Sequence, residues 1–170
     1  MSSSSLAPRS LTGPRALAVQ GALLALAAVV LPALGHAAGI ASSVLLPMHW
    51  PVLLAGLLFG ARTGALLGVA APLAAFAASG MPPLVVLPAM IAELAVYGAV
   101  AGLRREARIG AMLPWLALAL VAGRGAFAGV MALQTGTFGA AAGLVAGAPA
   151  ALAQLVALPL LARWCLRRAA

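Results

Sequence analysis

Residues 84–108 read LVVLPAMIAELAVYGAVAGLRREAR, an apolar run that ends in a cluster of arginines. A helix needs about 20 apolar residues to cross the hydrocarbon core of a bilayer. Residues 84–103 meet that length with Glu93 as their one charged side chain. Because arginine collects in cytoplasmic loops, the stretch predicts a transmembrane helix followed by a cytoplasmic connection.

The rest of the chain has the same apolar character. Its 170 residues are 65% hydrophobic and 7% charged, a composition that excludes a water-soluble fold. Comparable apolar runs predict six transmembrane helices in all, and we therefore expect an all-α integral membrane protein. The approximate spans are residues 16–34, 44–61, 64–78, 84–103, 109–133 and 138–162.

The positions of the arginines predict the orientation. Nine of the ten precede the first span, follow the last span, or lie in the second-to-third and fourth-to-fifth connections: Arg9, Arg15, Arg62, Arg104, Arg105, Arg108, Arg163, Arg167 and Arg168. The other three connections contain none, so both termini are predicted to be cytoplasmic. We expect residues 1–14 to be a disordered cytoplasmic tail and residues 15–168 a single six-helix domain. The expected location is the cell inner (plasma) membrane, as a multi-pass protein.

Composition also excludes several function classes. The chain has no lysine, so it lacks a P-loop, and Cys165 is its only cysteine. No Cys/His cluster has metal-ligand spacing, and no nucleophile is paired with a base, so we predict no metal site, no cofactor and no enzyme activity. So few charges in so apolar a chain do not build a nucleic-acid surface.

Two charged residues fall inside predicted spans and mark a candidate site. Glu93 and Arg124 each lie about nine residues, roughly 13 Å, from the outer end of a span. A charge at that depth costs a few kcal/mol unless it has a partner, a cavity or a ligand. One interpretation is a pair that locks two helices. The other, which we favour, is a polar pocket for a small solute.

The favoured interpretation depends on a third polar side chain, His49, at the same depth in the membrane as Glu93 and Arg124. His49 lies in Pro-Met-His-Trp-Pro, residues 47–51, which we expect to form an ordered loop before Pro51 because proline interrupts helices. Tyr97 lies one turn from Glu93 on the same helical face. Gly123, next to Arg124, leaves room for another backbone or a ligand.

Small residues at four-residue spacing predict close helix contacts. Gly56, Gly60, Gly64 and Gly68 surround the second turn, and Gly139, Gly143 and Gly147 open the sixth span. Such spacing lets helix backbones approach in lipid, and packing within the chain is the expected use. Ala18 and Ala22 belong to a similar stripe on the first span.

Two longer stretches carry a family resemblance. LPMHWPVLLAGLLFGARTGALLGV, residues 46–69, and SGMPPLVVLPAMIAELAVYGAVAGL, residues 79–103, resemble the substrate-binding S components of energy-coupling factor (ECF) vitamin transporters. The first and last spans are similar too, so the likeness covers most of the chain. It implies six helices with both ends inside, capture of a vitamin or related micronutrient from outside, and release powered by a scaffold transmembrane subunit and two ABC ATPase subunits.

The resemblance also implies roles for particular residues. The family's ligand contacts map onto Met48, His49, Glu93, Tyr97 and Arg124. Its coupling stripe maps onto Ala18 and Ala22 of the first span. Because an arginine near a histidine suits a carboxylate, a small acid such as pantothenate is the expected substrate.

Two alternatives stay open at this point. A non-transporting scaffold of envelope assembly, similar to rod-shape proteins, would be equally apolar but would not need Glu93 and Arg124 in a solvated layer. A self-sufficient carrier is the other alternative, although the chain has no evident inverted repeat.

Overall fold

The computed structural model describes residues 13–39, 46–104, 109–136 and 147–168, and these ranges contain helices and no strand. The first rod is continuous and consists of α1 (Gly13–Ala25), the π-helical turn η1 (Leu26–Val30) and α2 (Leu31–Ala37). The other helices are α4 (His49–Phe59), α5 (Ala61–Ser79), α6 (Leu87–Ala101), α7 (Ile109–Thr135) and α9 (Ala148–Arg168). The all-helical prediction is confirmed for the described residues.

Four of these helices are long and apolar enough to cross a membrane: the first rod over Gly13–Gly35, α5, α7 and α9. The other two are apolar but shorter, with 11 residues in α4 and 15 in α6. At about 1.5 Å per residue, α4 is roughly 16 Å long, about half the thickness of a bilayer core. The helices indicate a multi-pass membrane protein, and two of the predicted spans are only partly helical.

Prolines explain where the two short helices begin. Pro88 lies in the first turn of α6, and Pro51 lies in the first turn of α4. Proline is accepted there because the first N–H groups of a helix have no partner within the helix. The expectation of a loop before Pro51 was wrong for His49 and Trp50, because the helix already starts at His49 and Pro51 belongs to its first turn; residues 46–48 are non-helical, as expected.

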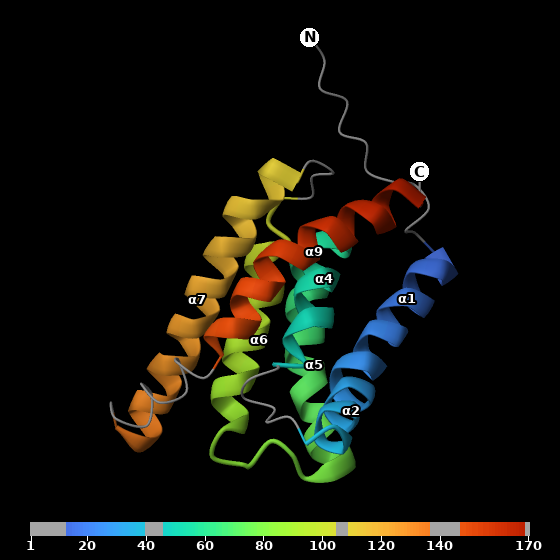
Figure 1. The fold of residues 1–170 in the computed structure, drawn as a ribbon. Helices are drawn as coiled ribbons and strands as arrows, with labels where there is room; N and C mark the ends of the chain where they lie inside the picture. The colour runs from blue at the N-terminus through green and yellow to red at the C-terminus, as the bar shows by residue number, and fades with distance from the viewer. Residues whose placement is uncertain (1–12, 40–45, 105–108, 137–146, 169–170) are drawn as a thin grey trace.

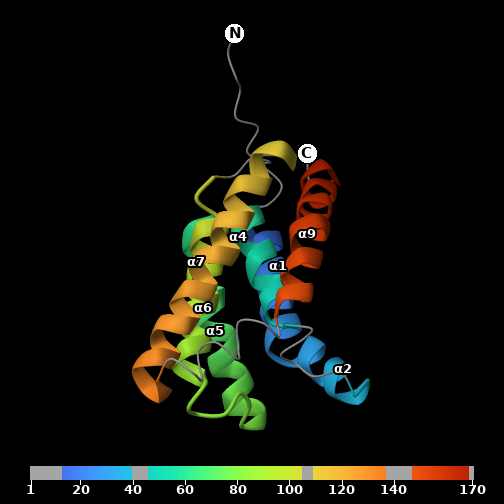
Figure 2. The same cartoon turned by 60° about the vertical axis from the view of Figure 1, so that its left-hand side comes forward.

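The helices alternate in direction and surround α4. Figures 1 and 2 show α4 in the middle of the bundle, and it packs against α5, α6, α9 and the first rod. His49 and all residues from Pro51 to Leu58 are buried. A helix that is apolar on every side is stable in such a central position. The surrounding helices instead present exposed apolar side chains, such as Val121 on α7, which is 72% exposed.

Glycines allow the closest contact in the bundle, between α5 and α6. Gly64 and Gly98 lie backbone against backbone, so neither position has space for a Cβ atom. Gly68 packs in the same way on the Leu94 backbone, and Gly56 faces the Gly98 carbonyl. The predicted use of Gly56, Gly64 and Gly68 in packing within the chain is confirmed, whereas Gly139 and Gly143 lie outside the described residues.

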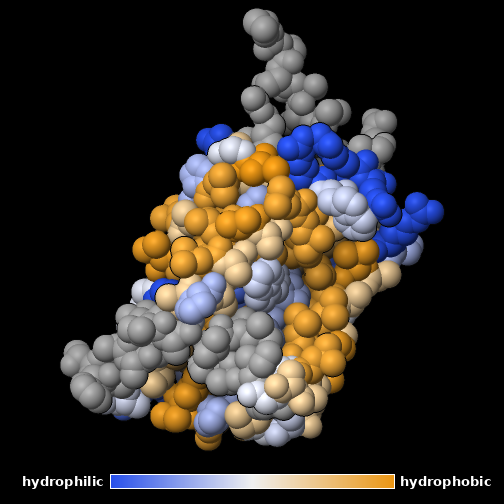
Figure 3. Space-filling view, in the orientation of Figure 1, coloured by the Kyte–Doolittle hydropathy of each residue, from blue (hydrophilic) through white to orange (hydrophobic). Residues whose placement is uncertain are grey.

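One end of the bundle carries the described arginines other than Arg124. Figure 1 shows that α1 and α5 begin at this end and that α6 and α9 finish there. Figure 3 shows strongly hydrophilic surface at the same end and a mostly hydrophobic flank. We call it the arginine end, defined by Arg15, Arg62, Arg104, Arg163, Arg167 and Arg168. Arg9, Arg105 and Arg108 lie outside the described ranges, as do residues 1–12 of the expected tail.

Candidate functional site

A cavity of about 270 Å³ lies toward the end of the bundle opposite the arginine end. Its wall comes from α2, the start of α4 and the chain just before it, the connection between α5 and α6, and the facing sides of α6 and α7. Most of the lining is apolar, with three methionines and four prolines. The lining residues are Pro32, Leu46, Pro47, Met48, His49, Met81, Pro82, Pro83, Val86, Met90, Glu93, Arg124 and Phe127.

The short central helix explains why space is left at this end. Because α4 begins only at His49, none of the described helices fills the centre of the bundle beyond its N-terminus. Residues 46–48 approach that point without helical structure, and Leu46 has a φ of 48°, in the left-handed region that a leucine rarely adopts. The structure thus holds a strained turn at the cavity wall, where such conformations are often tied to function.

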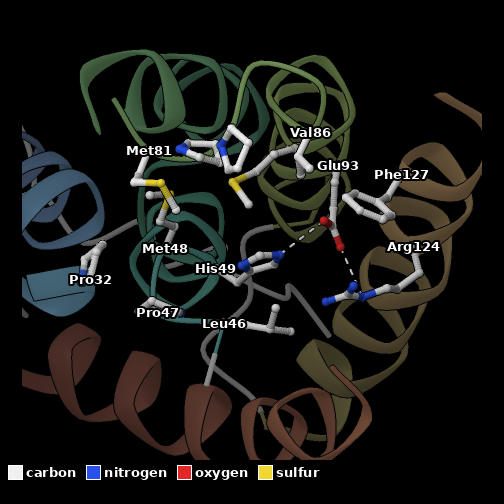
Figure 4. A pocket seen from close by; sticks show the side chains of 13 residues that line it. Pro32, Leu46, Pro47, Met48, His49, Met81, Val86, Glu93, Arg124 and Phe127 are labelled. Carbon is white, nitrogen blue, oxygen red and sulfur yellow. Dashed lines mark ion pairs between the residues drawn. The ribbon is translucent and has the colours of Figure 1, made fainter. Parts of the chain in front are cut away.

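The polar part of the cavity wall is a three-residue cluster from three helices. Glu93 of α6 is placed between His49 of α4 and Arg124 of α7 (Figure 4). Its Oε2 lies 3.3 Å from His49 Nε2, and its Oε1 lies 3.1 Å from Arg124 Nε. The side chains of His49 and Glu93 are each 2% exposed, and that of Arg124 is 15% exposed. The expectation that Glu93 and Arg124 share a layer is confirmed.

The charges of Glu93 and Arg124 cancel within the cluster, but some of its buried polar atoms have no hydrogen-bond partner among the described residues. Glu93 and Arg124 carry opposite charges, and a guanidinium offers five N–H donors, of which the Nε donor faces Glu93. Arg124 Nη2 and His49 Nδ1 are buried and have no hydrogen-bond partner in the part of the chain that the structure describes. An unsatisfied buried polar group costs about 1–3 kcal/mol. A ligand with acceptor oxygens would remove that cost at Nη2.

Tyr97 lies behind the cluster and is absent from the cavity lining. Its ring contacts the His49 ring edge to face, with centroids 5.2 Å apart and planes at 63°. The ring also lies against Gly123, whose missing Cβ makes the space. Gly123 therefore admits a neighbouring side chain. Tyr97 is fully buried, so its position supports His49.

The residues predicted to bind ligand thus fall into two groups. Met48, His49, Glu93 and Arg124 line the cavity, and Tyr97 does not. The sequence interpretation gave no role to Leu46, Met81 or Phe127, which line it as well. In so apolar a chain, nothing in the sequence distinguishes apolar residues that line a cavity from those that do not. Met81 does lie in Gly-Met-Pro-Pro, residues 80–83, within one of the two stretches that carried the resemblance.

Ala18 and Ala22, the predicted coupling residues, lie on the exposed side of α1. Gly21 between them is exposed too, and a Cβ there would meet no described atom within 4 Å.

The fold and the site together define a helical, multi-pass membrane protein. It has a small cavity, and an ion pair forms part of the cavity wall. No protein-family model, no curated protein and no solved structure matches the chain. Within the described ranges no group of three His, Cys, Asp or Glu residues is placed to hold a metal ion.

Proposed function

We propose that the protein is the substrate-capture subunit of an ECF-type importer in the inner membrane, with six spans and both termini in the cytoplasm. The observation that carries the proposal is the His49–Glu93–Arg124 cluster on the wall of a cavity of about 270 Å³. The positive-inside rule assigns the arginine end to the cytoplasm. The cavity then lies on the outer side, where a capture subunit meets its substrate.

The two short helices are compatible with six spans. Residues 46–48 before α4 and residues 80–86 before α6 are largely non-helical and contribute lining residues to the cavity. Irregular backbone at membrane depth is tolerated where it lines a cavity or is buried in protein. These segments extend the spans of α4 and α6 toward the outer surface, as in other solute-binding membrane proteins with interrupted helices.

The size and lining of the cavity support a small, partly apolar micronutrient with a carboxylate, such as pantothenate. Ligand sites are mostly apolar with a few polar groups that fix orientation. Met48, Met81 and Met90 provide adaptable contacts for an aliphatic body. Arg124 Nη2, which has no acceptor among the described residues, is the donor for the carboxylate.

The chain contains no lysine and therefore no P-loop, so it does not hydrolyse ATP by that mechanism. A scaffold transmembrane subunit and two ABC ATPase subunits supply the energy in this proposal. The exposed Ala18 and Ala22 side chains form the contact with the scaffold subunit.

Mass spectrometry of the small molecules that accompany the purified protein tests the proposal directly. We expect a small organic acid at near-stoichiometric amount, and we expect pantothenate added to stripped protein to raise its thermal stability. The competing interpretation is a scaffold of envelope assembly. One observation supports it: Glu93 already has two partners within the chain, His49 and Arg124, and so does not need a ligand. Purified protein that retains cell-wall enzymes but neither contains nor binds a small molecule would support the scaffold.

A further inference from the structure

We infer that Gly147 is a positioning residue that holds Arg124 in the orientation needed to select a carboxylate over a neutral ligand. This inference rests on the proposed function, since it concerns the same cavity. Gly147 directly precedes α9, and it is buried. In the sequence it looked like one of several helix-contact glycines, but its neighbour in the structure is a guanidinium.

The geometry around Gly147 is specific. A Cβ atom at this position would lie 2.6 Å from Arg124 Nη2, 3.0 Å from Arg124 Cζ and 2.9 Å from Leu46 Cδ1. The head of Arg124 thus occupies the space that any other residue at position 147 would fill. Leu46 lies on the same side of Gly147 and lines the cavity, so a ligand in the cavity approaches the guanidinium along Leu46.

Two contacts together fix the guanidinium. Glu93 Oε1 faces Nε at 3.1 Å, and the bare backbone of Gly147 lies beside Nη2 at the other end of the group. Nη2 has no acceptor among the residues that the structure places. The guanidinium is a charged donor for either acceptor, but only a carboxylate adds the Coulomb attraction of an opposite charge to the hydrogen bond. A carboxylate oxygen bonded to Nη2 therefore gains more than a hydroxyl in the same place.

A methyl group at position 147 displaces the guanidinium without disturbing the bundle. The atoms that it meets are the far ends of two flexible side chains, and none of the three nearest is a backbone atom. Arg124 can turn away and keep its charge, but Nη2 then leaves the position that serves the ligand. The predicted consequence is a loss of selectivity in a folded protein.

Two glycines on α7 provide matched controls. A Cβ at Gly125 or at Gly129 would meet no described atom within 4 Å, although Gly125 is adjacent to Arg124 in the chain. Gly125→Ala and Gly129→Ala make the same chemical change on the helix that carries Arg124. They leave the guanidinium where it is.

The test compares two probes, pantothenate and its neutral alcohol pantothenol, by titration calorimetry on detergent-solubilised protein stripped of ligand. We expect wild-type protein and both controls to prefer pantothenate. In Gly147→Ala, we expect pantothenate affinity to fall by about tenfold or more and pantothenol affinity to stay within about twofold. If too little Gly147→Ala protein folds, the double variant Leu46→Ala/Gly147→Ala is used instead, because it removes the Leu46 side chain that the new methyl group would also meet. Its affinities are then compared with those of Leu46→Ala alone.

The outcomes separate this inference from the function on which it rests. A preference for pantothenate that survives in Gly147→Ala overturns the role of Gly147 and leaves carboxylate capture standing. An equal loss of affinity for both probes also overturns it, because a general packing defect would act on both. Wild-type protein that binds neither probe overturns the proposed carboxylate capture, and this inference falls with it.

Discussion

Arg124 Nε lies 3.1 Å from Glu93 Oε1, so a single ion pair joins α6 to α7 at the wall of the cavity. The same carboxylate reaches His49 on the central helix through its other oxygen, Oε2, at 3.3 Å. Glu93 is therefore the shared partner of two side chains that line the cavity. Locking the helices and lining a ligand site are two roles of one cluster.

The ion pair predicts strong energetic coupling. Removing one partner of a buried pair typically costs about 3–5 kcal/mol, because the other charge stays buried and unpaired. We expect Glu93→Gln and Arg124→Gln each to lower the free energy of unfolding by about 3 kcal/mol, and the double variant to cost less than the sum by more than about 0.5 kcal/mol. Denaturant titration in micelles measures the free energy of unfolding of the wild type, the two single variants and the double variant. Strictly additive losses of this free energy would show that the two residues are not coupled.

The cavity assignment predicts that two of its polar residues bind ligand. We expect His49→Ala and Arg124→Ala each to weaken pantothenate binding by about tenfold or more while the protein still inserts in the membrane. Leu133→Ala, at a position that is 89% exposed, is the control for an ordinary truncation. Unchanged affinity in both variants would remove the ligand site from this layer.

Tyr97 is predicted to act through packing. Its hydroxyl is buried close to Glu93 and Arg124, but it has no well-aligned hydrogen bond to a described residue. Because an unsatisfied hydroxyl costs free energy, Tyr97→Phe should leave thermal stability unchanged or raise the free energy of unfolding by about 1 kcal/mol. Pantothenate affinity should also stay the same, since the ring that supports His49 is kept. A large loss of affinity in Tyr97→Phe would mean that the hydroxyl reaches the ligand.

The α5–α6 contact is predicted to tolerate no side chain at Gly98. A methyl group there would overlap the backbone of Gly64, which gives way less easily than a flexible side chain. Overpacking typically costs about 1–3 kcal/mol, and we expect Gly98→Ala to reach the upper end of that range. Gly110→Ala, whose Cβ would meet no described atom within 4 Å, is the control, and equal thermal stability of the two variants would contradict the contact.

The proposed coupling face makes a prediction about uptake. Bulky replacements Ala18→Trp and Ala22→Trp lie on an exposed side of α1, so we expect pantothenate binding to be unchanged. Uptake by whole cells should be lost, because large side chains there would block the contact with the scaffold subunit. Val121→Trp, on the exposed side of α7, should leave uptake intact. Normal uptake with both alanine replacements would place the coupling face elsewhere.

Local properties made much of the fold predictable. The prediction of apolar helices needed only hydrophobicity summed along the chain. The common layer of Glu93 and Arg124 followed from counting residues along helices of fixed rise. The start of α4 was misjudged because Pro51 was treated as a helix breaker when it occupies a first turn, where proline fits.

The inward faces of the helices were harder to predict. In a soluble helix, apolar periodicity marks the buried side, but here lipid-facing and core-facing positions are both apolar. Nothing in the sequence distinguished α4, which is buried all round, from the lipid-exposed helices. For the same reason, the sequence did not show that Tyr97 packs behind His49.

The sequence by itself determined that this is an apolar helical protein, that its arginines predict one orientation, and that a carboxylate and a guanidinium lie at one depth. These properties depend on transfer free energies and on the regular rise of a helix, which act residue by residue. Only the tertiary structure decided that Glu93 contacts both His49 and Arg124, and that Gly147 lies beside the guanidinium. Such contacts join residues far apart in the chain, and they are set by how whole helices pack.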